Sequence, residues 1–199
     1  GGLPGELHKL WQCSGPGSYH VEYGFSCMGY EIAGGLGVKM AKPDNEVVVM
    51  VGDGSYLMHN SELATSVMLG HKLIVVVLDN RGYGCINRLQ QATGGAGFNN
   101  LLQDCRTVEA GAPKTDFAAH AKALGCESES VTGIAELEQA LVRARSATST
   151  YVIALDTDPL PSTQEGGAWW EVAVPEVSER EAVNKAYQGY RKAKQRQRH

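Results

Sequence analysis

Runs of apolar, mostly β-branched residues recur along the middle of the chain. They occupy 46–51, 72–79 and 151–156. These runs hardly alternate with polar residues, which is typical of strands that are buried on both faces of a parallel sheet. We therefore predict three buried strands in one sheet, together with a further short strand at 126–131.

Apolar residues at helical spacing separate these strands. In the stretch 29–42, Ile32, Leu36 and Met40 form one stripe, and Pro43 ends the pattern. Several small residues lie in the same stretch, so another backbone or the chain's own sheet can approach it closely. Further helices are predicted at 61–69, 116–124, 134–147 and 178–195.

Three stretches show neither kind of periodicity. Residues 1–28 are punctuated by Gly, Pro and Ser, and we predict an extended entry segment there. Residues 85–115 are predicted to be irregular, with a mobile loop over a site at 93–100. Residues 157–177 form a Pro-rich extension.

The order of these elements predicts an α/β fold, with a doubly wound parallel sheet flanked by helices. We divide the chain into an entry segment (1–28), an α/β domain (29–156) and a C-terminal extension with a helix (157–199). The chain has 199 residues, 43% of them apolar, which is enough to bury one core of this kind.

Composition and charge narrow the classes of partner. The chain has 18 Lys and Arg against 22 Asp and Glu, and this net charge of −4 argues against nucleic acid as its main partner. Its five cysteines include no C-x-x-C pair, which favours a reducing compartment over a disulfide framework. No apolar run is long enough for a membrane span, and the first residues do not show the basic region and apolar stretch of a signal peptide. We therefore expect a cytoplasmic protein with no membrane contact.

Polar and glycine residues follow two of the predicted strands directly. Gly52, Asp53, Gly54 and Ser55 follow the first, and the stretch 79–82 follows the second. The 25 residues between Gly54 and Asn80 are enough for one helix and one strand. In parallel sheets ligands bind beyond the carboxyl ends of the strands, so the two stretches predict a shared site.

Hard oxygen atoms predominate in this predicted site. The Asp53 carboxylate, the Asn80 amide oxygen and the Gly82 carbonyl suit Mg²⁺, or Ca²⁺ in its place. Gly54 and Ser55 lie where a helix begins, so their N–H groups can hold phosphate. The combination predicts a metal-bridged diphosphate site, whereas the alternative is two ordinary turns.

Two other phosphate-binding patterns fit less well. A dinucleotide fingerprint needs a third Gly where the chain has Leu57, or Asn87 for the second turn. A P-loop is excluded because the sequence contains no G-K-[ST].

The G-D-G motif followed by about 25 residues and an Asn resembles the fingerprint of thiamine-diphosphate enzymes. By this resemblance the chain is similar to their C-terminal, diphosphate-binding domain. The resemblance implies that Asp53, Asn80 and Gly82 hold Mg²⁺ and that 52–55 lines the diphosphate of thiamine diphosphate. It also implies that the Ser26 carbonyl faces the cofactor's 4′-amino group and that Met28 wedges between its two rings.

Within this family, the chain is most similar to hydrolases of inositol catabolism. The segments that carry this similarity are 19–41, 50–66, 78–90 and 168–187. It implies hydrolytic C–C ring opening of a cyclic 1,2-dione, trihydroxycyclohexanedione, to 5-deoxy-glucuronate. The alternatives are a 2-keto acid decarboxylase, an acetolactate-synthase-like carboligase or a non-catalytic scaffold. Pyruvate decarboxylases resemble the chain less, because they carry a catalytic Glu six residues after the metal Asn, where this chain has Ile86.

Ring opening with addition of water needs a base and a proton donor. His20 and Glu22 are the candidates, with a plain loop histidine and a solvated carboxylate as the alternatives. Trp169 and Trp170 either shape a sugar-like pocket or pack at an interface. His59 either touches the cofactor or caps a helix.

The resemblance also implies a larger assembly. Family members activate the cofactor with a Glu on an N-terminal pyrimidine-binding domain, and their cofactor lies between two subunits. We therefore expect this chain to be the C-terminal part of a longer enzyme that forms a homodimer or homotetramer, and to be inactive alone.

Overall fold

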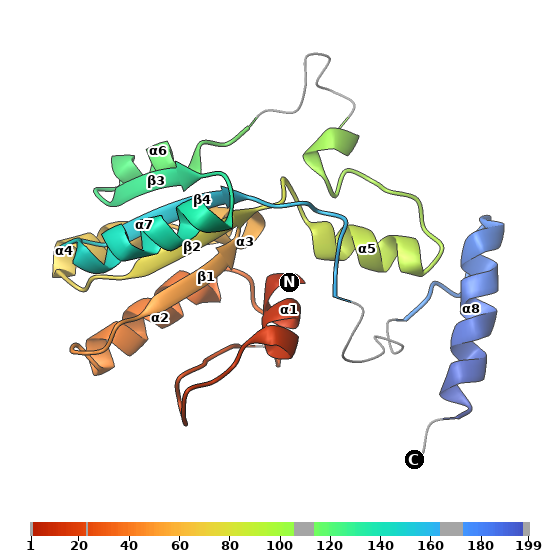
Figure 1. Cartoon of the computed structure of the whole chain (residues 1–199). Helices are drawn as coiled ribbons and strands as arrows, with labels where there is room; N and C mark the ends of the chain where they lie inside the picture. Colours follow the sequence, from red (N-terminus) through yellow and green to blue (C-terminus); the bar gives the residue numbers. More distant parts are fainter. Residues whose placement is uncertain (1, 23, 106–113, 164–172, 197–199) are drawn as a thin grey trace.

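The computed structural model describes residues 2–22, 24–105, 114–163 and 173–196. It contains one sheet of four parallel strands in the order β1-β2-β4-β3 (Figure 1). The predicted α/β fold with a parallel sheet flanked by helices is therefore confirmed. The strands are β1 (Val48–Gly52), β2 (Ile74–Asp79), β3 (Glu127–Val131) and β4 (Tyr151–Asp156).

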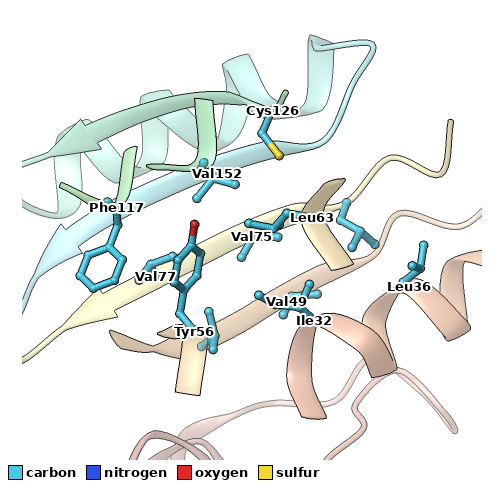
Figure 2. Packing of buried hydrophobic residues seen from close by; sticks show 14 residues of the cluster. Ile32, Leu36, Val49, Tyr56, Leu63, Val75, Val77, Phe117, Cys126 and Val152 are labelled. Carbon is cyan, nitrogen blue, oxygen red and sulfur yellow. The ribbon is translucent and has the colours of Figure 1, made fainter. Parts of the chain in front are cut away.

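Helices cover both faces of the sheet because the two central strands bury side chains on each. On one face, Val75 and Val77 of β2 belong to a hydrophobic cluster that also contains side chains from α2, α3, α4 and α6 (Figure 2). On the other face, Ile74 and Ile153 pack with Ala140 and Ala144 of α7. The helices are α2 (Tyr30–Ala41), α3 (Asp53–Met58), α4 (Glu62–Leu69), α6 (Phe117–Ala123) and α7 (Ile134–Ser146).

Tyr56 anchors the short helix α3 in this core. Its side chain is fully buried beside Phe117, with the rings edge to face at 5.2 Å (Figure 2). Its hydroxyl lies 2.9 Å from His120 Nδ1, which satisfies the one polar atom of the side chain. Burial raises the pKa of Tyr56. Because α3 starts at Asp53, this anchor also fixes the beginning of the helix.

The entry segment was wrongly predicted to be extended throughout, since Gly2–Leu10 forms the helix α1. Pro4 lies in its first turn, where a missing N–H costs little. Contacts with distant residues hold α1 in place. Lys9 Nζ donates to Thr163 Oγ1 at 3.2 Å, and Glu6 accepts from the Thr163 backbone N–H at 3.2 Å. A local reading of the Gly- and Pro-containing sequence does not reveal such contacts.

The stretch after β2 was wrongly predicted to be irregular from its start, because Gly84–Ala92 forms the helix α5. The helix buries the polar Asn87 and leaves Ile86 half exposed. Burial of a polar residue and exposure of an apolar one are the reverse of the pattern expected for an amphipathic helix.

The C-terminal helix α8 (Glu181–Lys194) lies within its predicted range. It packs beside Gly94, where φ is 85° and a Cβ would lie 2.5 Å from the Ala182 carbonyl carbon. Figure 1 shows α8 beyond α5, away from the sheet.

Trp169 and Trp170 lie outside the described residues. In the described part of the chain, no helix is long and apolar enough to cross a membrane.

Candidate metal centre

The ends of β1 and β2 lie side by side. The two strands pair in parallel, with Gly52 opposite Leu78, so Asp53 and Asp79 follow at the same edge of the sheet. The Gly82 backbone N–H donates to Asp53 Oδ2 at 2.7 Å and joins the two strand ends directly. The structure therefore brings together the two stretches that the sequence places 25 residues apart.

Asp53 is a buried carboxylate with only 6% of its surface exposed. Burial raises the pKa of Asp53, the hydrogen bond from Gly82 opposes this shift, and the charge of Asp79 raises the pKa further. Backbone N–H groups of Gly54 and Asn80 also favour the charged form. A carboxylate whose charge is destabilised in this way is stabilised when a cation binds it.

The Asn80 amide oxygen is buried without a hydrogen-bond partner. Leaving a buried acceptor unpaired costs about 1–3 kcal/mol, so such atoms call for an explanation. A cation at this oxygen would remove the cost. No group of three or more His, Cys, Asp or Glu in the described residues is arranged for a metal. A site here therefore depends on amide and carbonyl oxygens in addition to Asp53.

Gly82 completes a tight turn after β2. Its φ is 148°, and a Cβ there would collide with the Asn100 carbonyl oxygen and lie 2.9 Å from Leu101 Cα. Gly82 forms an isolated antiparallel bridge with Leu101, and the next N–H, of Tyr83, donates to the Asn100 oxygen at 2.7 Å. Only glycine fits this approach of two backbones.

Residues from three segments surround the start of α3. A Cβ on Gly54 would lie 2.7 Å from the Tyr83 ring and 3.4 Å from Met28 Cε. Met28 and Tyr83 therefore lie directly over the Gly54 backbone. An apolar side chain and an aromatic ring therefore lie against the glycine turn at the start of α3.

A hydrogen-bonded relay connects α3 to the residues before α2. The Gly29 backbone N–H donates to Ser55 Oγ at 2.7 Å, and Ser55 Oγ donates to Glu31 Oε2 at 2.6 Å. Gly29 has φ 90°, and a Cβ there would lie 2.9 Å from His59 Cβ. The relay holds the segment that carries Met28 against α3. Glu31 was missed by sequence reasoning because a Glu in the first turn of a helix is commonplace.

Ser26, His20 and Glu22 lie in the loop that precedes this relay. Ser26 has φ 53°, a strained backbone conformation for a residue with a side chain. His20 Nε2 lies 2.6 Å from the Tyr30 hydroxyl, and the two rings stack. Glu22 instead accepts hydrogen bonds from the backbone of its own loop. The structure thus gives His20 and Glu22 different partners.

The hydrogen bonds to Glu22 define its charge state. The backbone N–H groups of Phe25 and Cys27 donate to its two carboxylate oxygens at 3.0 and 2.7 Å. These hydrogen bonds lower the pKa of Glu22, and the bond from Phe25 has the largest effect. Glu22 therefore carries no proton to donate at neutral pH, and these hydrogen bonds make it a weaker base than an ordinary glutamate.

His59 lies between α3 and α4, and Cys85 and Ile86 lie in the first turn of α5. His59 Nε2 lies 3.5 Å from Glu62 Oε1 at the start of α4. Ile86 on α5 is 51% exposed, and Cys85 is half-buried beside Gly2 of α1. Cys85 therefore lies at a packing contact between two helices.

Comparison with known proteins identifies relatives of the whole chain. It is 44% identical over 194 residues to the 3D-(3,5/4)-trihydroxycyclohexane-1,2-dione hydrolase of Bacillus cereus (strain AH820), covering 94% of this chain and 30% of that protein. The same identity holds over 192 residues for the hydrolase of that name from Geobacillus thermodenitrificans (strain NG80-2), with the same coverage. The chain thus spans about a third of the length of these relatives.

A solved structure shares the fold. A thiamine diphosphate-dependent 4-hydroxybenzoylformate decarboxylase of Rhodococcus jostii RHA1 superposes with a TM-score of 0.58 at 21% identity, over 66% of this chain and 23% of that one. The family model described as "Thiamine pyrophosphate enzyme, C-terminal TPP binding domain" matches residues 1–155, which include both strand ends of the candidate centre. The chain belongs to this family of C-terminal domains of thiamine pyrophosphate enzymes.

Proposed function

We propose that this chain holds the diphosphate and metal half of the site of a thiamine-diphosphate-dependent hydrolase. The observation that carries the proposal is the unpartnered, buried Asn80 amide oxygen at the strand end next to the buried Asp53. A hard cation bound between the strand ends would stabilise both the buried carboxylate and the unpaired amide oxygen.

The donor set fits Mg²⁺ with a diphosphate. Asp53, the Asn80 amide oxygen and the Gly82 carbonyl would hold the metal, and 52–55 would line the diphosphate. The Ser26 carbonyl would face the aminopyrimidine ring of thiamine diphosphate, and Met28 would contact its rings, consistent with the position of Met28 over Gly54. When bound, thiamine diphosphate supplies a carbon nucleophile and an electron sink for C–C cleavage.

The proposed reaction is hydrolytic opening of a cyclic 1,2-dione ring, from trihydroxycyclohexanedione to 5-deoxy-glucuronate. Identity of 44% over nearly the whole chain to hydrolases with this name supports it. Ile86 also supports it over 2-keto acid decarboxylation, because this exposed side chain on α5 has no group that can exchange a proton.

His20 and Glu22 are proposed for the proton transfers that addition of water requires. Glu22, which is ionised at neutral pH, would accept a proton. His20, hydrogen-bonded to the Tyr30 hydroxyl, would deliver one.

The rest of the site is proposed to come from outside this chain. Its span of about a third of its relatives supports an N-terminal pyrimidine-binding domain with the activating Glu elsewhere in the protein. The assembly would be a cytoplasmic homodimer or homotetramer, and this chain would be inactive alone.

Turnover by the complete protein tests the proposal. With Mg²⁺ and thiamine diphosphate, we expect release of 5-deoxy-glucuronate from the cyclic dione and no CO₂ from pyruvate or benzoylformate. Asp53→Ala should abolish turnover, whereas Asp44→Ala, at an exposed carboxylate between α2 and β1, should retain it. CO₂ release without ring opening would favour a decarboxylase.

A further inference from the structure

Asp79 lies directly before Asn80, and the proposed function gives it no part. It is 4% exposed at the end of β2. Its Oδ1 accepts a hydrogen bond from the Arg81 backbone N–H at 2.8 Å. A side-chain oxygen that binds the N–H two residues later forms an Asx turn, and this turn spans Asn80.

The turn holds Arg81 in an unfavourable backbone conformation. Its φ is 60°, which residues other than Gly, Asn and Asp adopt reluctantly. Three further contacts hold it there. The Arg81 carbonyl oxygen accepts a hydrogen bond from the Leu102 N–H at 2.9 Å. The Arg81 guanidinium lies 3.9 Å from Asp156 Oδ2 and donates to the Thr157 carbonyl oxygen at 3.4 Å. The backbone on either side of Asn80 is thus fixed without a cation.

We propose that Asp79 is a positioning residue for the metal centre: its carboxylate folds the turn that keeps the Asn80 amide oxygen buried and unpartnered for a cation. This inference rests on the proposed function. Groups that orient metal ligands typically change metal affinity by 10–100-fold when they are removed.

The alternative role of Asp79 is to add negative charge near the cation. Its charge already acts on Asp53 and on Lys114. Arg81 and Lys114 both lie within ion-pair distance of Asp156 at the same edge of the sheet, so positive charge is close by. Asp79→Asn separates the two roles, because Asn keeps the acceptor oxygen and removes the charge.

The test is a titration of the complete protein with Mn²⁺ in the presence of thiamine diphosphate, followed by electron paramagnetic resonance. We expect Asp79→Ala to weaken Mn²⁺ binding at least tenfold and Asp79→Asn to remain within threefold of the wild type. A smaller loss in Asp79→Ala, or a larger one in Asp79→Asn, overturns the positioning role.

Failure of the proposed function can be distinguished from failure of the role of Asp79. If the wild type binds no Mn²⁺, the proposed function fails rather than the role of Asp79. If Asp79→Ala does not fold, its folding loss is taken together with Asp79→Asn: folding and binding within threefold in Asp79→Asn support the role of the acceptor oxygen, and a larger loss overturns it.

Discussion

The Gly29 backbone N–H donates a hydrogen bond to the hydroxyl oxygen of Ser55 at 2.7 Å, and this bond joins the segment before α2 to the first turn of α3. Ser55 is 5% exposed, and its hydroxyl donates a hydrogen bond to Glu31. The Ser55 hydroxyl therefore serves a buried donor and a partly buried acceptor at once. Two parts of the proposed cofactor site depend on it.

Ser55→Ala is expected to lower the free energy of unfolding by about 1–3 kcal/mol, because it leaves the Gly29 N–H without its acceptor. Urea unfolding measures this loss. Ser61→Ala is the matched control, since the Ser61 side chain makes no capping hydrogen bond at α4. Equal stability of Ser55→Ala and Ser61→Ala would contradict the role of the relay.

Gly82→Ala and Gly37→Ala are expected to have opposite effects. At Gly82 the added Cβ meets the Asn100 carbonyl oxygen and φ is 148°, so we expect a loss of at least about 2 kcal/mol. At Gly37, within α2, nothing lies within 4 Å of a Cβ. Alanine there should stabilise the protein by about 0.5–1 kcal/mol. The unfolding temperatures of both variants are compared with that of the wild type. An unchanged unfolding temperature in Gly82→Ala would contradict the close approach of the two backbones at this turn.

The Glu129 carboxylate links three elements and makes stability depend on pH. It accepts from Arg143 of α7 at 2.9 and 2.6 Å and from the Tyr151 hydroxyl of β4 at 2.6 Å. The bonds from Arg143 lower the pKa of Glu129 below its ordinary value of 4.5. Its contribution is thus fully present above pH 4.5 and is lost as the pH falls through the lowered pKa.

Glu129→Gln should therefore cost about 1 kcal/mol at pH 7 and make unfolding less sensitive to acid. Urea unfolding at neutral and acidic pH gives both values. Glu127→Gln is the control, at an exposed position on the same strand. An unchanged acid dependence in Glu129→Gln would show that other carboxylates cause it.

The local sequence pattern was sufficient to predict the sheet and the position of the two strand ends. Residues 74–78 of β2 and 151–155 of β4 are apolar without a break, so the burial of these runs follows from the sequence pattern, whereas the burial of Asp79 does not. Asp53 and Asn80 were found because parallel strands end at one edge. These inferences need only the chain direction and the spacing of residues.

Features that depend on distant contacts were not predicted. Helix α1 is held by Thr163, far along the chain, and α5 buries the polar Asn87. The role of Glu31 depends on Ser55 of another helix. Asp79 was predicted only as the last residue of a strand, because its burial and its bond to Arg81 depend on the folded edge of the sheet.

Calorimetric titration of the complete protein with Mg²⁺ and thiamine diphosphate tests the central claim most directly. We expect the wild type to bind, and Asp53→Ala and Asn80→Ala to bind at least a hundredfold more weakly. The controls Asp44→Ala and Asn45→Ala, at exposed positions between α2 and β1, should bind as the wild type does. Wild-type affinity in Asp53→Ala and Asn80→Ala, or no binding by the wild type, would contradict a metal and diphosphate site at these strand ends.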